Sequence, residues 1–366
     1  MSFKTYMNIK TQFDNVGDAL IIRELLKLVS KRSETIVDAS RCPVEFIETI
    51  TDGQDIELKI VSNGFLFLLF RMAADIFKGH SVYYFLIPGA LFGEKTLRAY
   101  LTSLLTCLIM FGMKLSGVRI CQIGISYDHL GPKHLSILQT RNRMLFKSMV
   151  RDPISYAYAS QLGIRVDGIL PDLAFNLSAV KDPLKNRDAI AFSFRADKYA
   201  GADETLMNAV LKIVELIPSE VRIILVLQVK RDRPYMWLLK SKIEKSTNRG
   251  LEFVEHFADI EKCRAVYTGC THIFSNRLHG LLLALSVGAK PIAVINPKLD
   301  EKIIGVYQYM GKPALVLDAA SLTEQEISVA LNDAFDFDLS RPKSDLKQFF
   351  DQLYLRSDLH NRSTDI

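Results

Sequence analysis

The residues best suited to chemistry in this chain stand close together in residues 275–280, which read SNRLHG. Arg277 carries a planar guanidinium that fits phosphate or carboxylate groups. His279 is the side chain most able to give or take a proton near neutral pH, and Gly280 would let a ligand approach the backbone closely. These residue types indicate an anion-binding site beside a general acid or base.

A strand–helix–strand unit is predicted to position this run. Residues 272–274 have the composition of a buried strand, and residues 278–287 have the length and apolar content of a helix. Ser275 and Asn276 are good N-cap residues for that helix, and the strand pattern resumes at 291–295.

The start of this helix would add to an anion site. Its first backbone N–H groups, around Leu278, lack partners within the helix and lie at the positive end of the dipole. Taken locally, two ordinary alternatives remain open: a surface ion pair for Arg277 and a histidine without a catalytic role at His279.

The composition is that of a globular protein with a sizeable core. The chain has 366 residues, of which 49% are hydrophobic and 24% charged, and this length suits two domains. A net charge of +5 fits an anionic substrate or membrane surface but is too diffuse to indicate nucleic acid. The five cysteines form no CxxC pair and no metal-ligand spacing, so we expect a reduced, cytoplasmic protein without a metal site.

Two apolar runs bear on localisation. Residues 1–12 lack the apolar core of a secretory signal. Residues 99–113 are uncharged but shorter than the ~20 residues of a membrane span, so we interpret them as a buried helix. The alternative is peripheral contact with the inner face of a membrane, which the nearby run 64–70 (GFLFLLF) keeps open.

The N-terminal stretch predicts a tight loop between a strand at 4–10 and a helix at 19–29. Asp18 is placed to cap that helix, and Gly17 permits the sharp turn into it. The loop also has the placement of a functional one, at the end of a strand.

Further candidates follow other strands. Asp128 lies in the loop after a predicted strand at 119–125, Arg151 stands at a predicted helix start, and Arg195 follows a strand at 189–194. An arginine at such positions could reach a phosphate or carboxylate. The run 230–233 (KRDR) is interpreted as a solvated charged loop.

Strands alternate with helices in both halves, around a polar, linker-like stretch at 178–188. We therefore expect α/β architecture with two doubly wound, Rossmann-like domains facing a cleft. The predicted boundaries are 1–177 for the N-terminal domain, 189–345 for the C-terminal domain and 346–366 for a terminal helix and tail.

Several motifs occur in an order that resembles the polysaccharide pyruvyl transferase family. They are Asn15-x-Gly17-Asp18, Arg151-Asp152-x-x-Ser155, Pro171-Asp172, Ser193-x-Arg195 and the SNRLHG run with Gly288-x-x-Pro291 and Lys298 behind it. The resemblance implies a GT-B-like fold. It also implies transfer of the enolpyruvyl unit of phosphoenolpyruvate to a sugar of an exopolysaccharide or capsule precursor, closing a pyruvate ketal.

Roles follow from that resemblance. His279 would be the acid, with Asp18 or Asp128 as base; Arg277, Arg195 and Arg151 would hold phosphoenolpyruvate, the co-substrate, with no further cofactor. Binding of substrate would also involve these positions: Asn15, Gly17, Leu278 and Gly280. The resemblance implies a saccharide acceptor, as an oligosaccharide on a lipid carrier. Two alternatives remain: a GT-B glycosyltransferase that binds a nucleotide sugar through Asp300 and Glu301, and a non-catalytic adaptor in polysaccharide assembly.

Overall fold

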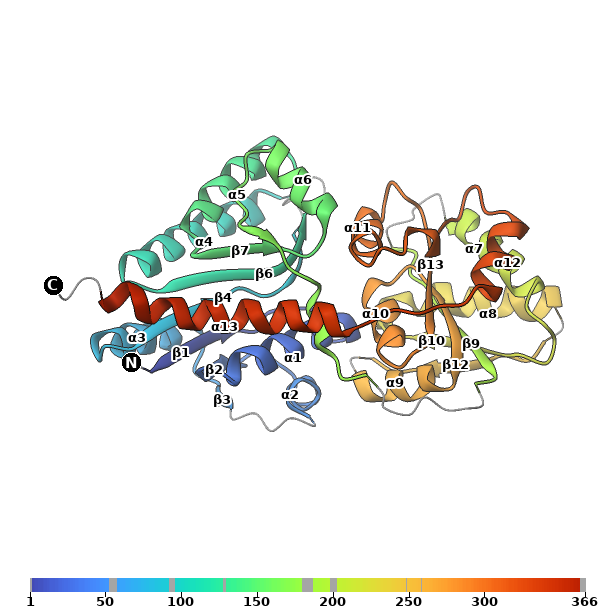
Figure 1. Cartoon of the computed structure of the whole chain (residues 1–366), viewed down its shortest axis with the longest axis horizontal. Helices are drawn as coiled ribbons and strands as arrows, with labels where there is room; N and C mark the ends of the chain where they lie inside the picture. The colour runs from blue at the N-terminus through green and yellow to red at the C-terminus, as the bar shows by residue number, and fades with distance from the viewer. Residues whose placement is uncertain are drawn as a thin grey trace. The chain divides into compact units, whose positions relative to one another are not determined.

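The structure is a computed structural model that describes residues 2–52, 58–91, 96–127, 130–179, 187–197, 203–247, 249–257 and 259–362. The chain divides into two compact units (Figure 1). The first unit comprises Met1–Thr11, Ile21–Leu173 and Ser340–Ile366, and the second comprises Gln12–Leu20 and Ala174–Leu339. The short segment Gln12–Leu20 thus belongs with the second unit, although most of the first unit follows it in sequence.

The first unit is built on one parallel sheet with the strand order β3-β2-β1-β4-β6-β7-β8, and β5 pairs with β6. The chain winds outward from β1 in one direction and from β4 in the other, which makes the sheet doubly wound. Its strands are β1 (Phe3–Asn8), β2 (Glu34–Asp38), β3 (Leu58–Val61), β4 (Ser81–Phe85), β5 (Gly89–Leu91), β6 (Arg119–Tyr127), β7 (Lys147–Val150) and β8 (Gly168–Ile169). Its helices are α1 (Val16–Ser30, whose first residues belong to the second unit), α2 (Val44–Thr51), α3 (Phe65–Phe77), α4 (Leu97–Leu115), α5 (Pro132–Met144), α6 (Pro153–Gln161) and α13 (Ser340–Arg362).

The second unit repeats the plan with a parallel sheet in the order β11-β10-β9-β12-β13-β14. Its strands are β9 (Ala189–Ser193), β10 (Arg222–Leu227), β11 (Glu252–Glu255), β12 (Cys270–Ser275), β13 (Lys290–Ile295) and β14 (Val316–Asp318). Its helices are α7 (Asp203–Glu215), α8 (Arg233–Thr247), α9 (Ile260–Thr268), α10 (Leu278–Ser286), α11 (Glu301–Tyr309) and α12 (Glu324–Asn332), and a short 3₁₀ turn, η2 (Lys230–Asp232), follows β10.

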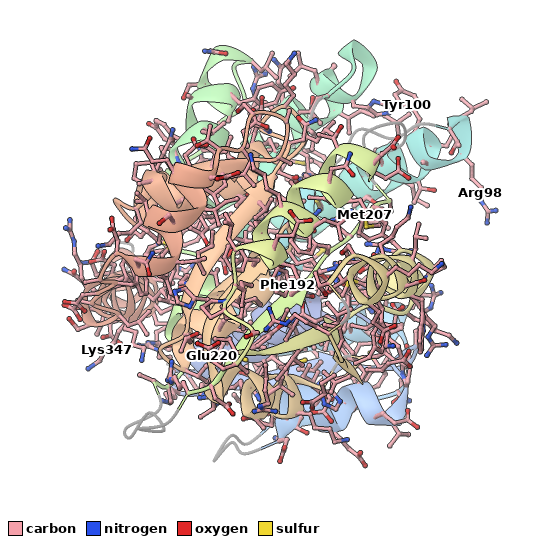
Figure 2. The ribbon with its side chains drawn as sticks, turned by 90° about the vertical axis from the view of Figure 1, so that its right-hand side faces the viewer. Arg98, Tyr100, Phe192, Met207, Glu220 and Lys347 are labelled. Carbon is pink, nitrogen blue, oxygen red and sulfur yellow. The ribbon has the colours of Figure 1, made fainter. Side chains whose placement is uncertain are left out.

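The central strands of the second sheet are held together by aromatic packing. Phe192 of β9 and Phe274 of β12 are paired in register, are fully buried, and stack with ring centroids 5.3 Å apart. Figure 2 labels Phe192. Every residue of β9 and β13 is buried, as expected for a parallel sheet covered on both faces, and this explains why both strands are apolar apart from Ser193 at the end of β9 and Lys290 at the start of β13.

The C-terminal helix returns to the first unit. Within α13 the carbonyl of Leu353 accepts a 3.0 Å hydrogen bond from the Tyr83 hydroxyl, and the Tyr354 hydroxyl lies 2.7 Å from Thr5 Oγ1. Arg32 forms an ion pair with Asp351 at 2.7 Å. The segment predicted as a separate tail therefore packs with the first sheet, because its aromatic side chains complete that core.

The predicted buried helix at 99–113 is wrong in its burial. The helix exists as α4, but only Met110 and Met113 of its apolar residues are fully buried. Most of its leucines face outward. Apolar composition alone predicted a core helix, because composition cannot distinguish a fully buried helix from one that exposes an apolar face.

His272 in β12 gives the second unit a pH-dependent stability. Burial, with the neighbouring Lys290 ammonium as the second cause, lowers the pKa of His272 to about 4. The folded state therefore favours the neutral imidazole. The contribution of His272 to the free energy of unfolding is complete above the unfolded pKa of about 6.5, and it is lost as the pH falls from there to about 4. We expect the free energy of unfolding to decrease by up to about 3 kcal/mol over this range. Denaturant unfolding of wild type and His272→Gln at both ends of the range tests this. An equally steep loss in the variant would contradict it.

Candidate functional site

The second sheet changes winding direction between β9 and β12, and the predicted arginines follow those two strands. The chain proceeds from β9 toward β11 on one side and from β12 toward β14 on the other. In open α/β sheets, ligands bind beyond the carboxyl ends of the strands at such a switch point. Arg195 comes two residues after β9, and Arg277 comes two residues after β12. The topology thus places both side chains at the position where this fold binds ligands.

Ser275 and Asn276 join the two strand ends. Ser275 Oγ donates to the Ser193 carbonyl and accepts a 3.0 Å hydrogen bond from the Arg277 N–H. The Asn276 side chain accepts from the Arg195 N–H and donates to the Arg195 carbonyl, both at 2.8 Å. The prediction that these residues cap the helix is wrong: the N-cap of α10 is Arg277, and its side chain makes no capping bond within the described structure.

Arg277 is buried and paired with an acid. Its side chain lies 7% exposed, and its Nη2 donates to Oδ2 of Asp232, which is 2% exposed and ends η2. Neither Arg277 Nε nor Asp232 Oδ1 has a hydrogen-bond partner among the described residues. Burial lowers the pKa of Arg277, and burial also raises the pKa of Asp232 despite the neighbouring guanidinium. A buried ion pair with an open donor is incompletely satisfied, and an added anion would complete it.

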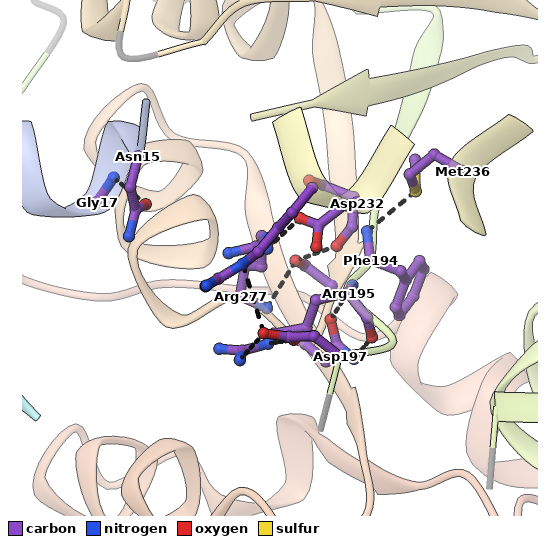
Figure 3. Close-up of polar contacts among 12 residues, drawn as sticks. Asn15, Gly17, Phe194, Arg195, Asp197, Asp232, Met236 and Arg277 are labelled. Atoms are coloured by element: carbon purple, nitrogen blue, oxygen red, sulfur yellow. Dashed lines mark hydrogen bonds and ion pairs between the residues drawn. The ribbon is translucent and has the colours of Figure 1, made fainter. Parts of the chain in front are cut away.

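Arg195 and Arg231 extend the charged group. Arg195 makes a bidentate contact with Asp197, at 2.6 and 2.8 Å, and Arg231 Nε lies 3.4 Å from the same carboxylate. Burial acts to raise the pKa of Asp197, but the hydrogen bond and charge of Arg195, with the charges of Arg231 and Arg277, outweigh it and lower that pKa. We name these residues the arginine cluster: Arg195, Arg231, Arg277, Asp197 and Asp232. Figure 3 labels all of them except Arg231. Three guanidinium groups against two carboxylates leave the cluster with a net positive charge.

Sequence reasoning missed three members of this cluster. Arg231 and Asp232 belong to the run 230–233, which was interpreted as a solvated charged loop, whereas Asp232 is buried. The run directly follows β10, the neighbour of β9 in the sheet, and that position was the available signal. Asp197 had a weaker signal, since it stands only two residues after Arg195.

His279 lies in the first turn of α10 and contacts Gly17, and both residues belong to the second unit. A Cβ placed on Gly17 would collide with Nδ1 of His279 and would lie 3.0 Å from its Cβ and Cγ. The imidazole is half-buried. Gly17 is therefore required by the close approach of the histidine ring, which links the N-terminal motif to the SNRLHG run.

Gly280 has a different role from the one predicted. A Cβ at this position would lie 2.8 Å from Oε1 of Gln228, a buried side chain that donates to the Tyr267 hydroxyl at 2.7 Å. The missing side chain makes room for Gln228, so the expectation that it admits a ligand is wrong. The Leu278 side chain is also buried, which leaves only its backbone for the predicted role.

Asn15 and Asp18 organise the start of α1. Asn15 Oδ1 accepts a 3.0 Å hydrogen bond from the Gly17 N–H, so Asn15 performs the capping that was predicted for Asp18. Asp18 instead accepts from Asn15 Nδ2 at 3.0 Å and from the Gln12 N–H at 3.4 Å. The Asp18 carboxylate is thus held on the turn whose Gly17 touches His279.

One predicted site residue, Arg151, is not part of this arrangement, and another, Asp128, cannot be placed. Arg151 is 2% exposed in the first unit, where it donates to Asp172 at 2.8 Å and to Ser126 at 2.7 Å. Asp172 is 1% exposed, so the predicted anion-binding role of Arg151 is wrong: its charge is matched inside the fold. Asp128 lies outside the described residues.

The acids predicted for a nucleotide-sugar enzyme lie at the start of α11. Asp300 is the N-cap and is 1% exposed, whereas Glu301 is exposed in the first turn. The buried carboxylate of Asp300 is poorly placed to bind the hydroxyl groups of a ribose.

Comparison with solved structures identifies the fold. The chain is similar to Anabaena HepE in complex with UDP and glucose, at 14% identity over 100% of both chains and a TM-score of 0.52. It is also similar to UDP-GlcNAc 2-epimerase from Methanocaldococcus jannaschii, at 11% identity over 96% of this chain and 99% of that one, with a TM-score of 0.57. A Phytolacca americana enzyme, UGT2, complexed with UDP-2-fluoro-glucose and pterostilbene matches at 9% identity over 96% and 94% of the chains, with a TM-score of 0.51. At these identities the likeness establishes a GT-B-type fold of two Rossmann-like α/β domains, as predicted.

Comparison of the sequence identifies the family. No curated protein sequence matches the chain. The family model described as polysaccharide pyruvyl transferase matches residues 15–297, which include the Asn15-x-Gly17-Asp18 motif, the SNRLHG run and every member of the arginine cluster. The chain therefore belongs to the polysaccharide pyruvyl transferase family.

Proposed function

We propose that this protein transfers the enolpyruvyl group of phosphoenolpyruvate to a saccharide and closes it into a pyruvate ketal. The observation that carries the proposal is the open Nε of buried Arg277, within a cluster of net positive charge at the start of α10. An unsatisfied buried guanidinium donor favours an anionic ligand, and family membership makes a saccharide the acceptor.

Phosphoenolpyruvate suits the arginine cluster because it is small and carries both a phosphate and a carboxylate. Arg277 would donate from Nε to one of these groups while Asp232 holds its Nη2, and the backbone N–H groups of the first turn of α10 would contribute further donors. Arg195 would contact the other group, either beside Asp197 or in exchange for it. Such contacts stabilise charge that develops during phosphate departure.

The reaction requires one proton to reach carbon. In our proposal His279 donates a proton to the methylene carbon, which becomes the methyl group, and the adjacent carbon acquires oxocarbenium character. One sugar hydroxyl attacks that carbon, and a second displaces phosphate to close the ketal. Of the two hydroxyl protons, one restores His279 and the other leaves with phosphate. Asp18, on the turn against His279, is the proposed base for a hydroxyl.

No further cofactor is needed for this sequence of steps, because phosphoenolpyruvate supplies the leaving group. We propose an acceptor that is a precursor of a surface polysaccharide, such as an exopolysaccharide or capsule. A cytoplasmic location would give the enzyme access to phosphoenolpyruvate.

Calorimetric titration separates this function from a nucleotide-sugar activity. The purified protein is titrated with phosphoenolpyruvate and, in parallel, with UDP-glucose. We expect binding of phosphoenolpyruvate and, with a competent saccharide, release of phosphate. Tight binding of UDP-glucose without a response to phosphoenolpyruvate would favour a glycosyltransferase. Binding of neither ligand would favour a non-catalytic adaptor.

Gly17→Ala tests the contact between α1 and the proposed acid. The added methyl group would displace the His279 ring, and a displacement of about 1 Å can reduce turnover about a hundredfold. Gly112→Ala in α4 is a matched control, because a Cβ there meets nothing within 4 Å. Both changes replace glycine in a helix, so neither should destabilise the helix itself. Turnover of Gly17→Ala equal to that of the control would show that the position of this ring does not matter.

A further inference from the structure

Two helices of the first unit that pack on the same core cluster, α3 and α4, each expose an apolar stripe. On α3 the outward residues are Leu66, Phe67, Phe70 and Phe77, and on α4 they are Leu97, Leu101, Leu104, Leu105, Leu108, Phe111 and Leu115. With about 3.6 residues per turn, these positions fall within roughly a third of the circumference, so each set lies on one side of its helix. Phe77 is 94% exposed and Phe70 75%. Scattered apolar residues are normal on a surface, but stripes this long indicate a binding surface.

Both stripes belong to the outer side of one helical layer. The inward residues of α3 (Leu68 and Met72) and of α4 (Met110 and Met113) join a single core cluster. The opposite sides of the two helices therefore face away from the same core. We call this outward surface the apolar face.

The charges around the apolar face are positive. Arg98 and Lys114 are exposed near the two ends of α4, and Lys78 is exposed at the end of α3. Figure 2 shows Arg98 projecting away from the ribbon. The single acidic residue within these two helices, Asp75, is buried and accepts a hydrogen bond from the Tyr6 hydroxyl. The exposed charges of both helices are thus cationic.

We propose that the apolar face binds peripherally to a lipid bilayer that contains anionic headgroups. Leucine and phenylalanine side chains would enter the boundary of the acyl chains, and the lysines and arginine at the margin would pair with the headgroups. A second copy of the chain is a poorer occupant. A two-fold interface would bring the same cationic residues toward one another, without an exposed acid on these helices to pair with them.

α4 would lie on the membrane and not cross it. By length and composition it could span a bilayer, and it is the one helix of the described chain that meets this test. However, Met110 and Met113 anchor it in the core of the first unit, and Lys114 donates to the Arg143 carbonyl in the last turn of α5 at 3.2 Å. Crossing the bilayer would require α4 to leave that core, whereas lying on the surface leaves the fold intact.

Vesicle flotation of the full chain tests this surface. Binding is measured on vesicles of phosphatidylcholine alone and on vesicles that also contain phosphatidylglycerol. We expect wild type to bind the anionic vesicles, and the triple change Phe70→Gln, Leu101→Gln and Leu108→Gln to weaken that binding more than about a hundredfold. Replacing both Arg98 and Lys114 by Gln should weaken binding to the anionic vesicles about thirtyfold and leave binding to phosphatidylcholine vesicles unchanged.

The controls separate surface effects from folding and self-association. Leu238→Gln with Val329→Gln changes comparably exposed residues of the second unit and should leave vesicle binding unchanged. Thermal unfolding should be similar for all variants, because the substituted side chains are exposed or partly exposed. Failure of wild type to float with anionic vesicles, or undiminished flotation of the triple variant, would overturn the proposal. A dimer that the triple variant dissociates, without vesicle binding by wild type, would identify a second copy as the occupant.

Discussion

Replacement of Arg277 by Gln is expected to weaken phosphoenolpyruvate binding by about a hundredfold. Arg277 offers an open Nε within a buried site, and truncation of a buried charged hydrogen-bonding partner costs about 2–5 kcal/mol. The dissociation constant measured by calorimetry tests this expectation. Arg222→Gln is the matched control, because Arg222 is an exposed arginine of the same unit that pairs with Asp188 and Glu252.

A second variant distinguishes lost binding from lost folding. Arg277→Gln alone leaves the buried Asp232 carboxylate without its counter-charge, which destabilises the fold. Changing Arg277 to Gln and Asp232 to Asn together removes both charges with little change in volume. This double variant should recover stability in denaturant unfolding but not affinity for phosphoenolpyruvate. If the double variant binds phosphoenolpyruvate with wild-type affinity, Arg277 does not contribute to that binding.

Replacement of His279 by Ala is expected to reduce turnover by about a hundred- to ten-thousandfold, the usual contribution of a general acid. Binding of phosphoenolpyruvate should remain measurable, since the arginine cluster is unchanged. Phosphate release in the presence of the acceptor saccharide measures the first effect, and calorimetry measures the second.

Two controls accompany this change. His279→Gln keeps a polar side chain of similar reach against Gly17 but cannot act as the acid, so it should lose turnover as well. The second control, His256→Ala, changes a histidine of the same unit that follows β11, and it should retain turnover. Full turnover by His279→Gln would show that the residue acts through packing alone and would exclude it as the proton donor.

The strand–helix–strand unit around α10 could be predicted because its local signals agree. The predicted helix 278–287 corresponds to Leu278–Ser286, and the second predicted strand corresponds to Lys290–Ile295. Gly288 adopts a positive φ of 78°, which is the conformation expected at a helix end. Alternating strands and helices likewise predicted the two Rossmann-like domains.

The partners of the arginines could not be predicted from local sequence. Arg151 and Arg277 both stand near a helix start, yet Arg151 donates from Nη1 to Asp172 and from Nε to Ser126, whereas Arg277 retains an open Nε beside Asp232. Asp172 lies 21 positions from Arg151 in sequence, and Asp232 lies 45 positions from Arg277. Only the fold brings each pair together. The difference between a structural and a ligand-binding arginine therefore depends on tertiary contacts.

Glycines and apolar helices carried a similar ambiguity. Gly17 and Gly280 were assigned to a turn and to ligand access, but the structure relates them to His279 and Gln228. The α4 sequence has the composition of a core helix, although its leucines repeat at helical spacing along an outward side. In each case the residue type was informative, but the residues that it contacts could not be predicted, because they belong to distant segments.

A crystal structure of the protein soaked with phosphoenolpyruvate would test the central proposal most directly. We predict a phosphate or carboxylate oxygen within about 3 Å of Arg277 Nε, with the methylene carbon facing His279. Bound phosphoenolpyruvate away from the arginine cluster, with Arg277 Nε still unpartnered, would contradict the proposal.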